Sequence, residues 1–303
     1  MVDETKRMSG VDIKLFYTRR EEPARVAVFL SGTGSNAEVL LDYAAGGDRG
    51  FVVSQLVTDA PESSAARRLG REYGVPVVEL DIRKFYRERG EESIRLDSDR
   101  RRQIRGEWSA ALWEMVRAGS PDFGVLAGFV PLTNIAAWLN CLNVHPGDLS
   151  LVGPDGGRLL AGLHFRPVER ALLSGHRTLR SSVILAQGYS GSGEQEMDSG
   201  PLLGVSSEVP VELDGITVEE LRRIAGERGH APFHDRLREL AQKNLERLKR
   251  AGDHIVLPRV VEAYAKGCYG FGEDGLYFRG GAGEWEPVRT VEFSVDGVKP
   301  IAR

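Results

Sequence analysis

Residues 25–36 read RVAVFLSGTGSN, an apolar run that passes directly into a glycine-rich turn. An amphipathic segment, Ala37 to Ala45, follows the turn. This order is typical of a buried strand, a tight turn and a helix. Glycine lets the backbone approach a ligand closely, and free N–H groups at the start of the helix would hold an anion, most simply a phosphate. Taken alone, the turn fits a purely structural role equally well.

The same alternation of strands and helices continues along the chain. It predicts strands at 51–57 and 76–80 with a helix at 62–73 between them, and a fully buried strand at 123–129 after a helix at 106–118. Short links between such elements are typical of parallel strands joined by crossover helices. We therefore predict an α/β fold with a Rossmann-like, mostly parallel sheet and helices on both faces.

A second informative stretch is Leu142-Asn-Val-His-Pro146, at the end of another apolar run. In a strand, Asn143 and His145 lie on one face because side chains alternate. An amide can polarise a carbonyl and stabilise the oxyanion that forms on attack, and an imidazole can take up the proton of an attacking amine. The pair therefore indicates acyl transfer. The structural alternative is an asparagine that caps the next turn and a histidine bonded to the backbone.

Asp198 begins a tight turn, Asp198-Ser-Gly-Pro201, directly before a predicted strand at 202–206. An aspartate held there could accept a hydrogen bond from His145 and fix the tautomer of its ring. Turns of this kind are more often structural than catalytic.

Two long stretches are strongly charged. Residues 81–105 are expected to form a solvated face that includes Arg100, Arg101, Arg102 and Arg105. The alternative is an arginine that reaches a carboxylate or phosphate of a ligand. Residues 217–250 are predicted to be helical throughout, with an apolar stripe that would dock on the core or on a second subunit. A helix at 253–266 and a hairpin at 275–293, turning at 280–283, are predicted to follow.

Composition excludes several classes of protein. The chain has 303 residues, of which 41% are hydrophobic and 28% charged, and a net charge of −4, so no excess charge points to nucleic acid or an anionic membrane. Two cysteines, Cys141 and Cys268, cannot form a disulfide framework or a thiolate cluster, which favours a reducing cytosol. We find no signal peptide and no apolar run long enough to span a membrane, and therefore expect a cytoplasmic protein. The histidines show no metal-ligand spacing, so no metal is expected.

A nicotinamide-dependent oxidoreductase is a competing interpretation of the glycine turn. Gly32, Gly34 and Ala37 also fit the dinucleotide-binding fingerprint. Asp59, at the end of the second strand, would then bind a ribose diol. The second half of the chain offers no evident partner for a hydride donor.

Four motifs in this order resemble the folate-dependent formyltransferases, and within that family the branch that formylates glycinamide ribonucleotide. They are Ser31-Gly-Thr-Gly-Ser-Asn36, Leu126-Ala-Gly-Phe129, Asn143-Val-His145-Pro146 and Asp198-Ser-Gly-Pro201. Each motif is weak alone, but four in order with compatible separations are specific. The resemblance covers roughly residues 25–293, without residues 1–22 and most of 217–250.

The resemblance implies transfer of a formyl group from 10-formyltetrahydrofolate, a co-substrate, to the amine of a phosphorylated substrate, most simply glycinamide ribonucleotide in purine biosynthesis. It implies that Asn143, His145 and Asp198 are catalytic. The substrate phosphate would be bound by Gly32, Thr33, Gly34, Ser35 and Asn36. Folate would contact Phe129, Val130, Leu132 and Val183, and Asp253 would contact the acceptor sugar.

Several departures from the family pattern leave the acceptor open. Ile184 stands where a histidine is common, the link at 188–196 is long, and the loop from Gly147 to Gly162 is enlarged. The remaining alternatives are a different acceptor, hydrolysis of formyltetrahydrofolate, and a non-catalytic relative that binds folate. Partners are expected to be small molecules, with a homodimer left open.

The predicted organisation is an N-terminal extension, 1–22, and a single formyltransferase domain, 23–303. The domain would comprise a phosphate-binding half, a catalytic and folate-binding half, a helical insertion, and a C-terminal helix with a hairpin. These parts are 23–125, 126–210, 211–252 and 253–303.

Overall fold

The computed structural model describes residues 5–8, 11–188, 198–229, 234–281 and 283–303. Its centre is a nine-stranded sheet, parallel through its middle and antiparallel around β9 and at the β15–β16 edge. In sheet order the strands are β16 (Gly297–Ile301), β15 (Thr290–Ser294), β10 (Leu202–Ser206), β9 (Ser182–Leu185), β7 (Cys141–His145), β6 (Phe123–Leu126), β3 (Ala24–Phe29), β4 (Phe51–Thr58) and β5 (Val77–Glu79).

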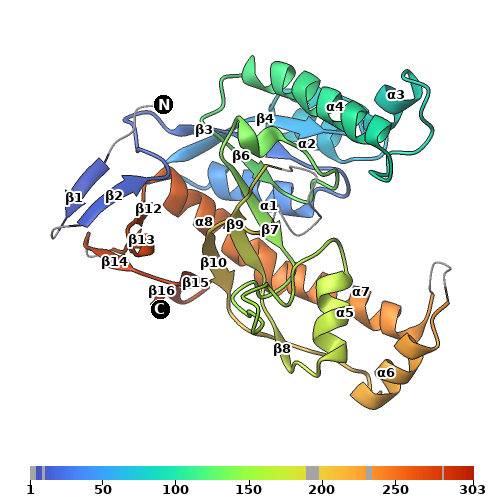
Figure 1. Cartoon of the computed structure of the whole chain (residues 1–303). Helices are drawn as coiled ribbons and strands as arrows, with labels where there is room; N and C mark the ends of the chain where they lie inside the picture. The colour runs from blue at the N-terminus through green and yellow to red at the C-terminus, as the bar shows by residue number, and fades with distance from the viewer. Residues whose placement is uncertain (1–4, 9–10, 189–197, 230–233, 282) are drawn as a thin grey trace.

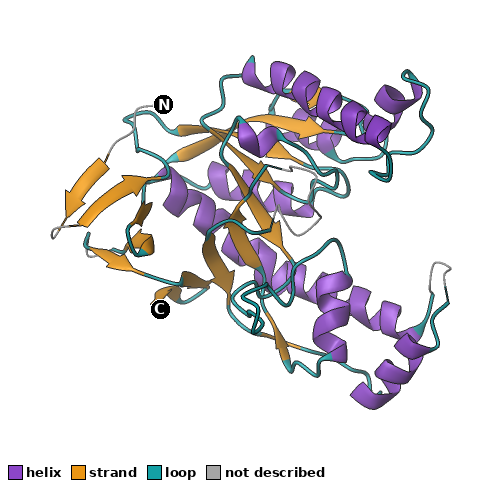
Figure 2. Cartoon of the chain, viewed as in Figure 1, coloured by secondary structure: helices purple, strands orange, loops and turns teal. Residues whose placement is uncertain are grey.

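Helices cover both faces of this sheet, as predicted (Figure 2). One face packs in a single apolar cluster with α1 (Ser35–Ala45), α2 (Ala66–Tyr73) and α8 (His254–Ala265). The other face packs with α3 (Ile82–Arg87), α4 (Asp99–Arg117) and the short 3₁₀ helix η1 (Ile135–Ala137). Strands buried on both sides explain the nearly continuous apolar runs that mark β3 and β6 in the sequence.

A lobe of three helices extends from one end of the sheet (Figure 1). It contains α5 (Arg166–Leu173), α6 (Val218–Gly226) and α7 (Arg236–Leu248), joined by an apolar cluster of their own. The small strand pair β8 (Thr178–Leu179) and β11 (Val209–Pro210) lies at its base, and a π-helical turn, η2 (Lys249–Asp253), connects α7 to α8.

The prediction of one continuous helix over 217–250 is wrong. The Thr217 hydroxyl accepts a hydrogen bond from the Glu220 amide, and the Asp235 carboxylate accepts one from the Arg238 amide. Each of these residues is an N-cap that begins a new helix. The apolar stripe on α7 packs inside the lobe against α5 and α6, so it is covered within the described structure and needs no second subunit to bury it.

The charged stretch 81–105 is also more structured than predicted. Asp81 caps α3, and Ser98 caps α4, which therefore begins at Asp99 rather than at Gly106. The solvated-face interpretation fails for Arg105, which is buried and donates to the carbonyls of Leu132 and Ile94. The arginine-rich first turns concealed the helical periodicity of this segment.

The segment predicted as an N-terminal extension takes part in a second, antiparallel sheet with three strands that follow α8 (Figure 1). In order, this sheet contains β1 (Thr5–Met8), β2 (Val11–Leu15), β12 (Tyr269–Gly272), β13 (Gly275–Arg279) and β14 (Trp285–Pro287). Ile13 on β2 is 1% exposed, and the pair β13–β14 is the predicted C-terminal hairpin. No helix in the described part of the chain is long and apolar enough to cross a membrane.

Candidate active site

A cavity of about 420 Å³ opens at the carboxyl ends of β3, β6 and β7. Ligands of open α/β sheets bind at this edge because strand ends and helix N-termini converge there. Most of the predicted site residues line it, although they come from distant parts of the sequence. They are Gly32, Thr33, Gly34, Ser35, Asn36, Phe129, Val130, Asn143, His145, Asp198 and Asp253.

Asn143, His145 and Asp198 lie together on one side of this cavity. The Nδ1 atom of His145 is 3.6 Å from Oδ2 of Asp198, and Nδ2 of Asn143 is 3.5 Å from Oδ1 of the same carboxylate. His145 and Asp198 are only 3% and 5% exposed. The Gly162 amide donates to Oδ2 of Asp198, so the carboxylate is held by backbone as well as side chains.

The tautomer of His145 is set by a residue that the sequence did not indicate. Its Nε2 atom lies 2.7 Å from the carbonyl oxygen of Leu160. A carbonyl can only accept a hydrogen bond, so Nε2 carries the hydrogen and the neutral ring keeps its lone pair on Nδ1. We expected Asp198 to fix the tautomer, but Nδ1 and Asp198 are separated by more than a normal hydrogen bond. The Nδ1 lone pair is therefore the group that can take a proton.

The glycine turn forms another part of the cavity wall. Gly34 has φ +73° and precedes the first residue of α1, and a Cβ there would lie 3.0 Å from carbons of Leu30 and Leu69. Only glycine fits this backbone conformation without strain. The turn presents the first, unpaired N–H groups of the 11-residue helix α1 to the cavity, an arrangement that favours an anion.

Asp253 is tied to this wall. Its Oδ2 accepts a 3.0 Å hydrogen bond from Asn36, and its Oδ1 accepts a 2.5 Å hydrogen bond from Ser181. Burial raises the pKa of the Asp253 carboxyl, although both hydrogen bonds oppose the shift. The Oδ1 atom of Asn36 is buried without a hydrogen-bond partner among the described residues. It can accept a hydrogen bond from a ligand in the cavity.

Lys249 also lines the cavity, although it was not predicted from the sequence as a site residue. Leu245, Lys249 and Asp253 are spaced by four residues, and the π-helical turn brings all three to the same cavity. Their spacing was visible in the sequence, but the charged surroundings favoured an exposed helix. The ammonium group of Lys249 donates to Oε1 of Glu246 at 2.8 Å, and Lys249 adds a cationic side chain to the lining of this cavity.

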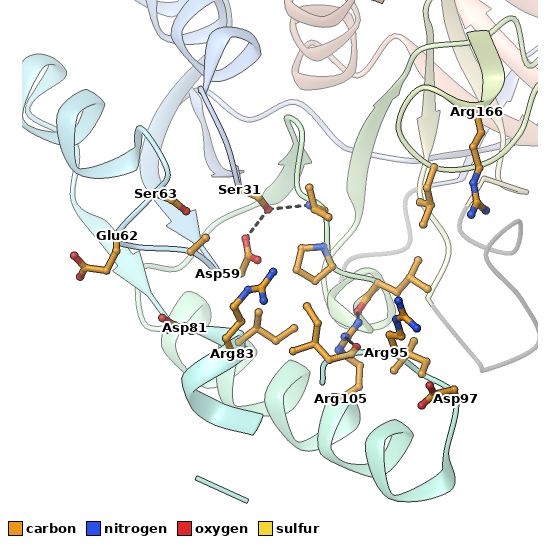
Figure 3. A pocket seen from close by; sticks show the side chains of 18 residues that line it. Ser31, Asp59, Glu62, Ser63, Asp81, Arg83, Arg95, Asp97, Arg105 and Arg166 are labelled. Carbon is orange, nitrogen blue, oxygen red and sulfur yellow. Dashed lines mark hydrogen bonds between the residues drawn. The ribbon is translucent and has the colours of Figure 1, made fainter. Parts of the chain in front are cut away.

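A larger cavity of about 960 Å³ adjoins the first and shares Ser31, Val130 and Leu163 with it (Figure 3). The Ser31 hydroxyl donates to Asp59 and accepts from the Val130 amide. Burial raises the pKa of Asp59. The carboxylate that would bind a ribose diol in a dinucleotide enzyme is thus already bonded to Ser31.

The remaining predicted residues fall in different places. Leu132 lines the larger cavity. Val183 and Ile184 are fully buried in β9 and line neither cavity. The long link at 188–196 lies outside the described residues apart from Gly188. Among the described residues, no group of three or more His, Cys, Asp and Glu side chains is arranged to hold a metal ion.

Comparison of the sequence with protein-family models and with curated proteins gives no significant match. Solved structures do match the fold. A phosphoribosylglycinamide formyltransferase from Anaplasma phagocytophilum has a TM-score of 0.56 and 21% identity, over 90% of this chain and 98% of that one. A phosphoribosylglycinamide formyltransferase from Coxiella burnetii, in complex with CHES, has a TM-score of 0.55 and 16% identity, over 90% of this chain and 100% of that one.

A third structure, glycinamide ribonucleotide transformylase 1 from Symbiobacterium toebii, has a TM-score of 0.50 and 22% identity, over 82% of this chain and 91% of that one. At these identities the likeness shows the fold, which is that of the formyltransferases.

Proposed function

We propose that this protein transfers a formyl group from 10-formyltetrahydrofolate to the amine of a phosphorylated acceptor. The observation that carries the proposal is one cavity lined by an amide, an imidazole and a carboxylate and also by a helix N-terminus that can bind an anion. The fold, shared with phosphoribosylglycinamide formyltransferases, supports the same reaction class.

The chemistry assigns one role to each side chain. The acceptor amine attacks the formyl carbon, a C–N bond forms, and the carbonyl oxygen becomes an oxyanion that the Asn143 amide stabilises. Nδ1 of His145 takes the proton from the attacking nitrogen, and the nearby Asp198 carboxylate stabilises the imidazolium. The bond from the formyl carbon to N10 of the folate then breaks, and N10 receives the proton.

The acceptor that fits best is glycinamide ribonucleotide, which would place the protein in purine biosynthesis. A phosphate would bind the N–H groups of the glycine turn and the ammonium of Lys249. Asn36 and Asp253 lie next to this position and would face the sugar. Fixing the phosphate lets binding energy orient the amine toward the formyl carbon.

The larger cavity gives room for the rest of the folate. Val130 is common to both cavities and Leu132 continues the apolar wall. Arg83 and Arg95 also line this cavity and would suit the carboxylates of the folate glutamate (Figure 3). We place the aromatic part against the apolar wall and the carboxylates toward these arginines.

The test is absorbance-monitored deformylation of 10-formyltetrahydrofolate with and without glycinamide ribonucleotide, beside His145→Ala. Turnover that requires the ribonucleotide and is lost in the variant is expected. Turnover without any amine would instead identify a hydrolase. Equal rates in the wild type and His145→Ala would refute the proposed role of the imidazole.

Two further outcomes address the competing interpretations. Folate binding without turnover on any amine would indicate a non-catalytic relative. Saturable binding of a nicotinamide dinucleotide, combined with no folate binding, would favour the oxidoreductase, because the glycine turn and Asp59 line adjoining cavities. In that case Asp59→Asn should weaken dinucleotide binding.

A further inference from the structure

The enlarged loop between β7 and α5 contacts both His145 and Asp198. The carbonyl of Leu160 accepts from Nε2 of His145, and the amide of Gly162 donates to Oδ2 of Asp198. Two catalytic groups are therefore oriented by backbone atoms that are only two residues apart. What holds this short piece of backbone in place also holds the catalytic geometry.

The loop is built as a small hairpin that ends in an arginine. Val152 and Arg158 form an antiparallel bridge, and the Leu159 amide donates to the Leu151 carbonyl. The turn between them is closed by the Gly153 amide, which donates to the Gly157 carbonyl. The hairpin presents Arg158 directly before the residues that contact the catalytic pair.

Arg158 reaches across to the turn that carries Asp198. Its Nη1 donates to the carbonyl of Asp198, and its Nη2 donates to the carbonyl of Gly200 at 2.7 Å. A guanidinium group suits this task because its planar fork can bond two acceptors at once. Arg158 does not line the catalytic cavity. It lines a separate hollow of about 590 Å³, together with Ser199, Gly200 and Pro201.

We propose that Arg158 is a positioning residue for the catalytic reaction: by bonding the carbonyls of Asp198 and Gly200, it fixes the loop and the turn together and so sets the relative position of His145 and Asp198. This rests on the proposed function. Arg158 touches neither substrate, so its loss should lower the rate of the chemical step while leaving binding largely intact. A misplacement of about 1 Å in a catalytic group can cost on the order of 100-fold in rate.

The experiment compares the wild type with R158M, R158K and the control R289M. Arg289 is an exposed arginine that lines the same hollow and donates to the Ser150 carbonyl at the base of the loop, but no hydrogen bond within the described part of the chain joins it to Leu160 or to residues 198–201. We expect R158M to lower kcat by about 10- to 100-fold with both KM values within about threefold, and R158K to recover part of the loss. R289M should keep the wild-type kcat. Wild-type kcat in R158M, or an equal loss in R158M and R289M, would overturn the proposal.

A second readout does not depend on turnover. In ¹⁵N-histidine spectra, with the His145 signal assigned from His145→Ala, the neutral wild-type ring should carry its hydrogen on Nε2. In R158M the carbonyl of Leu160 is released and the His145 signal should shift, whereas in R289M it should not. If the wild type shows no formyl transfer, the proposed function fails, yet this shift still decides the role of Arg158. An unchanged His145 signal in R158M would refute the role of Arg158 alone.

Discussion

Asn36 and Asp253 lie 217 positions apart in the sequence, yet Nδ2 of Asn36 donates a 3.0 Å hydrogen bond to Oδ2 of Asp253. This bond joins the first turn of α1 to the π-helical turn η2. It therefore connects the two segments that would hold the phosphate and the sugar of the acceptor. Asp253 is 3% exposed, so the affinity of its carboxylate for a proton depends on whether the chain is folded.

The first prediction concerns the pH dependence of stability at Asp253. Burial raises its pKa in the folded protein above the ordinary value of 3.8. As pH rises above that value, the unfolded chain loses its proton first, which favours unfolding. The stabilisation from Asp253 is thus complete below the unfolded pKa and is lost as pH rises through the folded pKa. Urea unfolding of the wild type and Asp253→Asn should show the wild-type advantage shrinking as pH rises above about 4.

Asp214 provides the control for this measurement. Its pKa is lowered by a hydrogen bond from Lys243, so its contribution should appear above the unfolded pKa and be lost at low pH. Asp214→Asn should therefore give a slope of the opposite sign. Equal slopes for the two variants would contradict the burial of Asp253.

The second prediction concerns Lys249. A charge-assisted hydrogen bond to a phosphate contributes roughly 1.5–3 kcal/mol, so Lys249→Ala should raise the KM for a phosphorylated acceptor about 10- to 100-fold. The KM for 10-formyltetrahydrofolate should stay near the wild-type value. Both lysines form ion pairs, Lys249 with Glu246 and Lys243 on α7 with Glu212 and Asp214. Lys243 does not line the cavity, so Lys243→Ala is the matched control. A Lys249→Ala enzyme with an unchanged KM for the acceptor would exclude the cation from the phosphate site.

The third prediction separates two asparagines, Asn143 in the middle of β7 and Asn140 directly before this strand. Asn143→Ala should lower kcat by about 10²- to 10³-fold, the usual loss of an oxyanion donor. Asn140 donates instead to the Phe16 carbonyl and the Tyr264 hydroxyl, outside the cavity. Asn140→Ala should cost about 1 kcal/mol in the free energy of unfolding and leave kcat unchanged. Steady-state kinetics and urea unfolding of both variants distinguish the two roles.

The fourth prediction concerns the backbone of the Asp198 turn. A Cβ at Gly200 would lie 1.8 Å from the Leu185 carbonyl oxygen, so the turn cannot keep its position with any other residue. Gly200→Ala should lower the free energy of unfolding by roughly 1–3 kcal/mol or more. Gly106, inside α4 with nothing within 4 Å of a Cβ, is the opposite case. Gly106→Ala should raise stability by about 0.5–1 kcal/mol, and thermal unfolding measures both.

The sequence indicated the sheet and most of the cavity because each rests on local signals. The strand β3 and its glycine turn, and the alternation that places Asn143 and His145 together, are encoded within a few residues. The bonds to Leu160 and Arg158 were not foreseeable, because they depend on how a hairpin without a distinctive pattern folds back onto a turn 40 positions away. The N-cap residues Thr217 and Asp235 could have corrected the helical prediction, since both types favour helix starts.

The pairing of β2 with β12 has a consequence for the synthesis of the protein. Leu15 pairs with Gly270, so Ile13 cannot be buried until the ribosome has made nearly the whole chain. At about 5–20 residues per second, the strand emerges roughly 10–50 s before its partner exists. β1 can already pair with β2 during that interval, but the edge of β2 that later pairs with β12 stays open to chaperones and to wrong partners. Meanwhile α1 and the first parallel strands can already assemble.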